Sequence, residues 1–436
     1  MSAELISILA LVVVFVIATT RSINMGALAF AAAFAVGELV AGLDADGIFA
    51  GFPGDLFVVL VGVTYLFAIA RANGTTDWLV HAAIRLVRGR LALIPWVMFA
   101  ITAALTAIGA VSPAAVAIVA PIALSFAARY GISPLLMGAM VVHGAQGGGF
   151  SPISIYGSIV NGIVEREKLP GSELTLFFAS LVANLVIAGI VFVLFGGLKL
   201  SGKQEEPGLE QDRSAGKAGE PGEVDEKGQQ EPEHAASRLT PARIATLAAL
   251  VALVVAVLAF DLDAGLSSVT LAVLLSAFWP ETSRRAVGEI AWPTVLLICG
   301  VLTYVGVLEE MGTIDYAGHA VGDIGIPLLA AVLLCYIGAI VSAFASSVGI
   351  MGALIPLAVP FLAQGEIGAI GMITALAISA TVVDVSPFST NGALVLAAAP
   401  EVDRERFFRQ LMVYGGIVVA VVPAAVWLVL VVPGFG

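Results

Sequence analysis

Apolar runs long enough to cross a bilayer follow one another along this chain, in the same order before and after one polar segment. A membrane-spanning helix needs about 20 predominantly apolar residues. Each half of the chain also contains one long apolar stretch and one apolar run that is broken in its middle. We therefore predict an all-α membrane protein with about ten transmembrane helices, two re-entrant hairpins and two broken helices. The simple spans are expected near 3–20, 23–42, 55–72, 174–198, 241–260, 264–282, 291–308 and 405–432.

The composition excludes a soluble fold. Hydrophobic residues make up 59% of the chain and charged residues 12%, whereas soluble domains are about 45–50% apolar and about 25% charged. Because much of any folded surface stays exposed, so many apolar residues need lipid as their solvent. The net charge of −12 lies mostly in one polar segment and in loops, so we expect no nucleic-acid partner. The first apolar run has no basic region before it and another run follows closely, which indicates a retained span.

Residues 200–240 divide the chain near its centre. This segment is rich in Glu, Gly, Gln, Lys and Pro and nearly free of large apolar residues. Such a composition cannot bury enough apolar surface to fold, so it predicts a disordered linker. We therefore expect a first repeat at 1–199 and a second repeat at 241–436.

Each predicted repeat contains the same three special elements. A less apolar stretch predicts an arm helix along the membrane surface. A long apolar stretch with a polar break predicts a re-entrant hairpin, and a run interrupted by Ser-Pro predicts a broken helix. The first repeat has these elements at 75–90, 91–128 and 132–162, and the second repeat has them at 312–323, 325–363 and 367–399.

Local sequence supports a duplication. The arm segments at 74–78 and 312–316 both have Gly-Thr, then any residue, then Asp and an aromatic residue. The breaks at 151–154 and 386–389 both have Ser-Pro, then an apolar residue, then Ser, at an offset of 235 positions. At the same offset Ser112 corresponds to Ser347. Three matches in one order indicate an internal repeat.

The distribution of Lys and Arg predicts the orientation of the chain. If the N-terminus is outside, nearly all basic residues that border the spans lie on the cytoplasmic side, and only Arg166 and Lys168 depart from this pattern. Both termini are then outside and the linker 200–240 is cytoplasmic. The second repeat enters the membrane in the opposite direction to the first, so the repeats are inverted. We expect a multi-pass protein of the inner or plasma membrane.

Paired breaks in two repeats are the best indication that a sequence gives of a transporter site. Half-helix N-termini present N–H groups that suit an anion, and freed carbonyl groups can coordinate a small cation. The alternative is that these Ser and Pro residues serve only helix packing and kinking. The candidate substrate-binding residues are Ser112, Pro113, Ser154, Ser347, Pro387, Ser389, Thr390 and Asn391. The candidate cation-binding residues are Ser112, Gly148, Ser151, Ser346, Ser347, Asp384 and Ser386.

Three ionisable residues fall within apolar runs, where a charge is costly and indicates function. Asp384 comes just before the Ser386 break, so it can bind a cation or carry a proton. His143 comes before the other break and is a second candidate for proton coupling. Glu38 lies near a helix end and is expected to reach the interface. Neither Asp384 nor His143 has a counterpart of the same type in the other repeat.

The sequence resembles a known family at these residues. The run Ser-Pro-Phe-Ser-Thr-Asn-Gly at 386–392 and the hairpin sequence Ser-Pro-Ala-Ala at 112–115, ending at Pro121, resemble dicarboxylate carriers of the malonate-carrier (MatC) type. These carriers are similar to the divalent anion:sodium symporters of the ion-transporter superfamily. The resemblance covers nearly the whole chain apart from 200–240. It implies two hairpins, arm helices, a homodimer, an elevator-type motion, a carboxylate substrate, and sodium sites at the hairpin tips and helix breaks.

The chain departs from the superfamily at the hairpin tips. The Ser-Asn-Thr motif of the superfamily falls at Ser112-Pro113-Ala114 in the first repeat and at Ser346-Ser347-Val348 in the second. Both copies keep the serine and lose the asparagine and the threonine. Backbone contacts therefore remain possible at these tips, whereas the side-chain contacts of the family are partly missing.

These observations predict a secondary active transporter of small dicarboxylates, such as malonate or succinate, coupled to sodium or proton. An oxyanion or arsenite exporter and a cation/proton antiporter remain alternatives on the same scaffold. An antiporter usually needs a cluster of buried carboxylates, and Asp384 stands almost alone. An enzyme is disfavoured because we find no HExxH motif, no paired aspartates in facing spans and no Ser/His pair supported by the repeat. A passive channel is less consistent with inverted broken helices. We expect no cofactor and no metal beyond transported sodium.

Overall fold

The computed structural model describes residues 2–21, 23–84, 90–200, 239–260, 262–314, 316, 326–343, 347–363, 365, 367–399 and 403–434. This part of the chain is all helical and contains no β-strand. Six of its helices are long and apolar enough to cross a membrane, and further apolar helices are shorter. The predicted fold class, an all-α membrane protein, is therefore confirmed.

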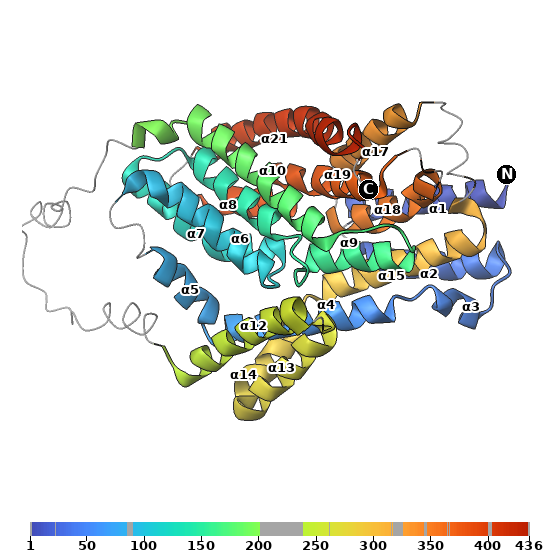
Figure 1. Ribbon diagram of the computed structural model, residues 1–436, viewed down its shortest axis with the longest axis horizontal. Coiled ribbons are helices and arrows are strands. Elements are labelled where there is room, and N and C mark those ends of the chain that lie inside the picture. Colours follow the sequence, from blue (N-terminus) through green and yellow to red (C-terminus); the bar gives the residue numbers. More distant parts are fainter. Residues whose placement is uncertain are drawn as a thin grey trace, which may run out of the picture.

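The helices of the first repeat are α1 (Ala3–Arg21), α2 (Met25–Leu39), α3 (Ala45–Ala50), α4 (Gly54–Ala72), α5 (Thr75–Ile84), α6 (Ile94–Ala107), α7 (Ser112–Tyr130), α8 (Pro134–Gly148), α9 (Ile155–Arg166) and α10 (Glu173–Leu194). Helices α1, α2 and α4 run roughly along the long axis of the molecule, whereas α5 and α10 are oblique to it (Figure 1).

The described helices from residue 241 onward follow a similar order. They are α12 (Pro241–Phe260), α13 (Ala264–Phe278), α14 (Pro280–Gly288), α15 (Trp292–Glu310), α17 (Pro327–Ser342), α18 (Ser347–Ala363), α19 (Ala369–Val382), α20 (Thr390–Ala398) and α21 (Arg404–Val426). The predicted arm at 312–323, the end of the first arm beyond residue 84 and most of the linker fall largely outside the described residues.

The sequence missed two short helices. We expected one span at 264–282, but α13 ends at Phe278 and α14 begins at Pro280. Pro280 lacks a backbone N–H and has a fixed φ, which suits the first turn of a new helix and not the interior of a span. The first repeat has a matching short helix, α3, which begins 235 positions before α14. Both follow the second span of their repeat.

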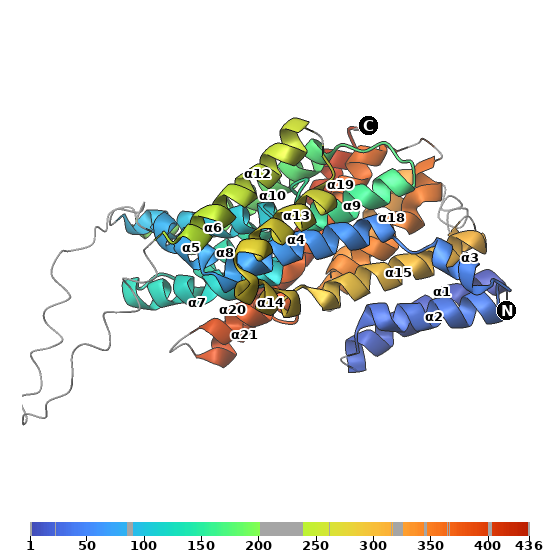
Figure 2. The same cartoon turned by 90° about the horizontal axis from the view of Figure 1, so that it is seen from below.

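The helices form two bodies, and each body takes elements from both repeats. In one body α4 packs on α13 and α2 packs on α15. In the other, α8 packs on α6, α7 and α10, while α19 packs on α17, α18 and α21. Figures 1 and 2 show α12, α13 and α14 beside α4, on one side of the molecule. The bodies meet where α4 contacts α9 and where α15 contacts α18.

The breaks lie inside the second body. The antiparallel helices α6 and α7 are joined by a short turn that contains Gly109, whose φ of +113° suits glycine. Helix α8 ends at Gly148, and α9 starts only at Ile155. In the second repeat α19 passes into a short 3-10 turn before α20. Helix α19 and this turn are almost completely buried, whereas α20 is partly exposed. The interrupted backbone is therefore shielded from lipid by protein, as it must be.

Candidate functional site

One large cavity lies where the hairpin tips and the broken helices face α2 and α15. Its volume is about 680 Å³, within the range of roughly 300–1,000 Å³ that is typical of small-molecule sites. The residues that line it are Ala18, Ile23, Asn24, Met25, Val111, Pro113, Tyr156, Pro293, Thr294, Leu297, Ser347, Val348, Asp384, Phe388, Thr390 and Asn391.

The N-termini of α2, α7, α15, α18 and α20 all reach this cavity. A residue from the first turn of each lines the wall, namely Met25, Pro113, Thr294, Val348 and Asn391. A helix N-terminus carries a partial positive charge and N–H groups that favour an anion. Among the described lining residues there is no Lys, Arg or His, and Asp384 is the single charged one. The wall therefore attracts an anion through backbone dipoles, and the Asp384 carboxylate needs a counter-charge.

A chain of hydrogen bonds joins the two hairpin tips beside this wall. Asn391 Nδ2 donates to Ser112 Oγ at 2.8 Å. The amide of Gln146 donates to Ser112 Oγ at 3.4 Å and to Asp384 Oδ2 at 2.7 Å. The Ser347 hydroxyl donates to the other oxygen of Asp384. Residues from both repeats thus meet around two hydroxyl groups, Ser112 at the start of α7 and Ser347 at the start of α18.

Position 391 and its repeat counterpart, position 156, both contact Ser112. The phenol of Tyr156 lines the cavity and interacts with the side chains of Ser112 and Gln146. The Oδ1 atom of Asn391 is buried and has no hydrogen-bond partner within the described part of the chain. A buried acceptor without a partner costs about 1–3 kcal/mol. This atom is therefore a position that a bound cation or a ligand donor would satisfy.

The second serine of each Ser-Pro motif caps a helix. Ser154 Oγ accepts from the backbone N–H of Gly157, and Ser389 Oγ accepts from that of Gly392, both at 3.2 Å. Ser154 is fully buried and Ser389 is 2% exposed. Their hydroxyls are thus committed to the start of α9 and of α20, and they orient these N-termini without facing the cavity.

Other candidate residues hold the breaks together. Ser151 donates to the carbonyl of Ala107 and so ties the first break to α6. A Cβ atom at Gly148 would lie 1.9 Å from the carbonyl oxygen of Ala103, so glycine permits the close packing of α8 on α6. Ser386 Oγ accepts from the backbone N–H of Phe388 at 3.3 Å. Pro387 is buried next to it, and Ser346 lies outside the described residues.

His143 lies one turn before Gln146 on α8, away from the cavity. Its Nδ1 is 2.9 Å from Asn184 Oδ1, and its Nε2 is 2.6 Å from the hydroxyl of Tyr414. Because Asn184 Nδ2 donates to the carbonyl of Ser180, Asn184 Oδ1 is left as the acceptor. Nδ1 therefore carries a hydrogen, and when the ring is neutral the hydroxyl of Tyr414 donates to Nε2. His143 joins α8 to α10 and α21.

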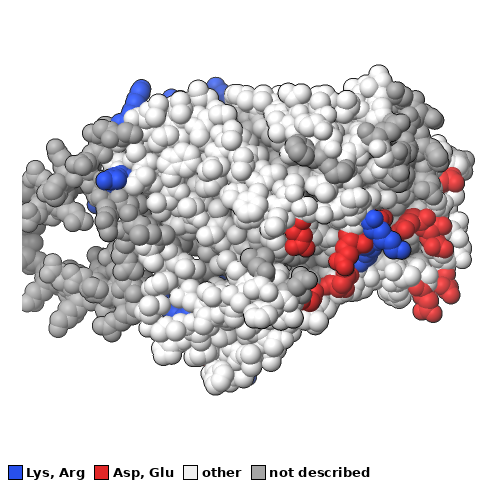
Figure 3. Space-filling view, viewed as in Figure 1, with Lys and Arg blue, Asp and Glu red and all other residues white. Residues whose placement is uncertain are grey.

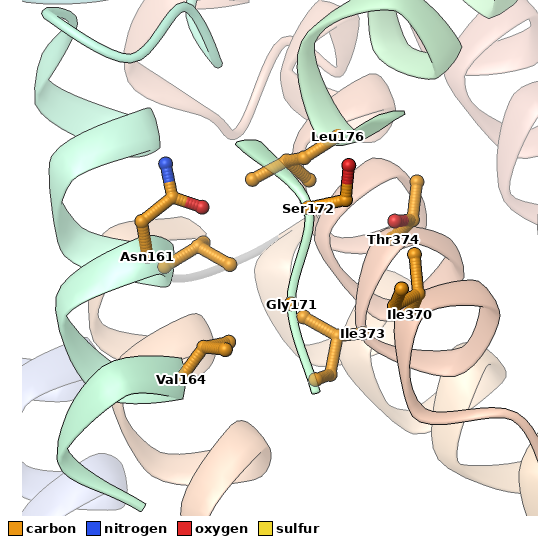
Figure 4. Close-up of a pocket in the computed structure, with 9 residues that line it drawn as sticks. Asn161, Val164, Gly171, Ser172, Leu176, Ile370, Ile373 and Thr374 are labelled. Atoms are coloured by element: carbon orange, nitrogen blue, oxygen red, sulfur yellow. The ribbon is translucent and has the colours of Figure 1, made fainter. Parts of the chain in front are cut away.

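A much smaller cavity lies between α9, α19 and the segment before α10 (Figure 4). Its volume of about 10 Å³ is enough for about one water molecule. Asn161, Ser172 and Thr374 give it polar groups, and Asn161 Nδ2 is buried there without a partner in the described part of the chain. This cavity suits a structural water and is too small for a carboxylate.

Two comparisons with known proteins agree with this geometry. Residues 1–149 match the family model of the dicarboxylate carrier protein MatC N-terminus. The crystal structure of the Alcanivorax borkumensis YdaH transporter, described as having an unusual topology, matches with a TM-score of 0.52 and 13% identity. The match covers 88% of this chain and 89% of that one. A comparison with curated proteins finds no match.

The resemblance stated from the sequence is confirmed by the MatC match, and at 13% identity the YdaH likeness shows the fold. The match to a carrier family model points to a transporter, and the apolar helices identify a multi-pass membrane protein. Among the described residues no group of three His, Cys, Asp or Glu side chains could hold a metal ion.

The structure brings some of the predicted residues together and places others elsewhere. The residues that line the cavity are Pro113, Ser347, Asp384, Thr390 and Asn391. Ser112 does not line it but accepts a hydrogen bond from Asn391. Glu38 is exposed near the end of α2, as expected for an interfacial residue.

Sequence reasoning missed the neutral polar residues of the network, which are Gln146, Tyr156, Asn184 and Tyr414. Ionisable groups within the apolar runs indicated only Asp384, His143 and Glu38. A buried amide within such a run, as at Gln146 and Asn184, is an equally strong signal because an unpaired amide is costly there.

Proposed function

We propose that this chain is a secondary active transporter of small dicarboxylates with three or four carbons, such as malonate or succinate. The observation that carries this proposal is the convergence of the N-termini of α2, α7, α15, α18 and α20 on one cavity. Among its described lining residues none has a basic side chain. Backbone dipoles can hold an anion without a buried arginine, so the anion can also leave.

In this proposal the dianion bridges the two repeats. One carboxylate faces the start of α7, at Ser112 and Pro113, and the other faces the starts of α18 and α20. The Ser347 and Thr390 hydroxyls and the Asn391 amide lie at these helix starts. Ser154 and Ser389 act by holding the broken-helix N-termini in place, and Pro387 by opening the backbone before α20.

The negative charge of Asp384 supports a requirement for a coupling ion. A carboxylate on the cavity wall repels an anionic substrate until its charge is neutralised, and it has no described basic partner. We propose that sodium or a proton neutralises it before the substrate binds. The candidate sodium positions are around Ser112, Gly148 and Ser151 in the first repeat and around Ser346, Ser347, Asp384 and Ser386 in the second. For a proton, Asp384 is the first candidate and His143 the second.

We further propose that the two bodies move relative to each other. The body of α6–α10 and α17–α21 carries the hairpins and the broken helices, and it meets the other body along α9 and α18. Sliding at these contacts would carry the site across the membrane, which is an elevator-type motion. A homodimer built through the body of α1–α4 and α12–α15 belongs to the same proposal and is supported by the family resemblance.

For the orientation we propose that both termini lie outside and the linker 200–240 in the cytoplasm. Arg71 and Arg129 occupy the last turns of α4 and α7, which both end toward the left in Figure 1, and Arg21 lies in the last turn of α1. Acidic side chains gather toward the opposite end of the molecule (Figure 3). Basic residues favour the cytoplasmic side of spans.

Thermal stabilisation of the purified protein tests the function. Malonate, succinate and other carboxylates would be added with sodium or choline as the cation, at an acidic and a neutral pH. A ligand that binds only the folded state raises the melting temperature by mass action. We expect a shift for a dicarboxylate that depends on sodium or on acidic pH.

The control ligands decide between the alternatives. A response to arsenite or another oxyanion, with none to any carboxylate, would contradict the proposal and favour an oxyanion exporter. A response to cations alone would favour an antiporter on the same scaffold.

A further inference from the structure

Gln146 is the central link between the two hairpin tips. Its side chain is fully buried. Its amide nitrogen donates to Ser112 Oγ at the start of α7 and to Asp384 Oδ2 in the second repeat. Asp384 in turn accepts from Ser347 at the start of α18. A single amide group therefore connects the tip of one hairpin to the tip of the other.

This link has no counterpart at the repeat-related positions, because neither Gln146 nor Asp384 is duplicated there. The residue that corresponds to Gln146 is Thr381, which is also fully buried. Its hydroxyl donates to the carbonyl of Ala377 in its own helix, at 2.9 Å. The counterpart of Asp384 is Gly149, which has no side chain. The donor thus comes only from the first repeat and the carboxylate acceptor only from the second.

A coupling ion that arrives at Asp384 changes what Gln146 can do. The ion competes for the carboxylate oxygen to which the amide donates at 2.7 Å. When that bond weakens, the amide is free to strengthen its longer bond to Ser112, now 3.4 Å. The position of Ser112 sets the first turn of α7, which faces the substrate cavity through Pro113. Ion binding at Asp384 therefore changes the position of the hairpin tip at Ser112.

We propose that Gln146 is the positioning residue that couples ion binding to substrate binding across the repeat interface. This inference rests on the proposed function, since it assigns a role within the same transport site. Coupling between two ligands is a free energy, and each ligand changes the affinity of the other by the same factor. If Gln146 is responsible for this factor, a variant without the Gln146 amide still binds the ion and the substrate, but neither ligand changes the affinity of the other.

The test compares ion-dependent malonate affinity in matched variants of the full chain. The dissociation constant of malonate would be measured in sodium chloride and in choline chloride at equal ionic strength. A parallel series without sodium would compare acidic with alkaline pH. The ratio of the two constants is the coupling factor. Gln146→Leu removes the amide, Gln146→Met does so with a more flexible side chain, and Thr381→Val removes the repeat-related polar group.

In the wild-type protein we expect a coupling factor of roughly 5- to 150-fold. The Gln146 variants should bring it close to one while keeping measurable malonate binding, and Thr381→Val should keep it. A merely structural role would instead weaken binding equally with and without the ion.

Three outcomes would overturn the inference. The first is a folded Gln146 variant, either Gln146→Leu or Gln146→Met, whose coupling factor equals that of the wild-type protein. The second is loss of the factor in Thr381→Val as well, because that points to a general effect of buried polar groups. The third is a wild-type protein that binds no carboxylate under any condition, which would remove the proposed function too. The first two would leave the proposed function intact.

Discussion

Ser154 and Ser389 lie 235 positions apart and make the same hydrogen bonds in the two repeats. Each shares its one hydroxyl hydrogen between the carbonyls of the residues five and three positions earlier, and each accepts from the N–H three positions later. The two helix breaks are therefore built to one design, in which a serine closes the turn and caps the next helix.

We expect Ser154→Ala and Ser389→Ala to destabilise the protein by similar amounts. Loss of a helix cap costs about 0.5–2 kcal/mol, and each variant also leaves buried carbonyls with one donor fewer. Thermal unfolding in detergent checks this. A variant with wild-type stability and greatly weakened substrate binding would show instead that the hydroxyl contacts the substrate directly.

Asn391→Ala should weaken uptake while leaving expression and folding intact. The amide bonds Ser112 and presents an unpaired oxygen to the site, so its removal takes away a ligand group and one tie between the repeats. Initial uptake rates in proteoliposomes measure the effect. Asn161→Ala is the control, because Asn161 lies in the small cavity beside α19. Equal uptake by wild type and Asn391→Ala would exclude Asn391 from the site.

Asp384→Asn should make dicarboxylate binding independent of the coupling ion. The amide can still accept a hydrogen bond from Ser347, but the negative charge that the ion must offset is gone. Malonate affinity with and without sodium, and at two pH values, is the measurement. An unchanged dependence on both sodium and pH in this variant would place the coupling site elsewhere.

Gly148→Ala should destabilise the protein much more than Gly189→Ala. The new methyl group at Gly148 would collide with the backbone of α6, whereas the one at Gly189 on α10 meets nothing within 4 Å. Overpacking costs about 1–3 kcal/mol, while alanine in place of glycine within a helix favours folding by about 0.5–1 kcal/mol. Melting temperatures of both variants give the comparison. Equal stability of the two would contradict the close packing of α8 on α6.

Glu167 should make stability depend on pH. Burial, and then the nearby charge of Glu309, raise the pKa of Glu167 above its ordinary value of 4.5, while Arg166 opposes this shift. The folded protein thus holds this proton more tightly than the unfolded chain does, so stability falls as pH rises from 4.5 through the raised pKa. Glu167→Gln should remove this loss, as melting curves across the range would show. A wild-type pH profile in the variant would assign the dependence to other groups.

Much of the fold could be predicted from the sequence because lipid restricts a chain to helices that satisfy their own backbone groups. The order of the spans and the places of the breaks follow from apolar length and from Ser-Pro. The short helix that begins at Pro280 was missed because the residues after the proline are polar, so they resemble a loop at the end of a span. The tip residue Ser347 and the carboxylate Asp384 were expected at the site.

The partners of these residues could not be predicted. Gln146 contacts Asp384 across 238 positions of sequence, and no local pattern reveals a contact between repeats. The helix caps that Ser154 and Ser389 form could not be predicted either. A buried serine beside a proline is consistent with a ligand contact or with a cap, and only the direction of its hydroxyl separates the two.

The contacts that cross between the repeats have a consequence for how such a protein could have arisen. A half-length ancestor could form this cavity only as an antiparallel pair of identical chains, so every contact would occur twice. Fusion into one chain lifts that requirement. In a single chain, Gln146 of the first repeat can contact Asp384 of the second. The repeat-related positions can then hold different residues, Thr381 and Gly149. The single polypeptide can therefore hold one charge at its centre, where the ancestral pair would have had to hold none or two.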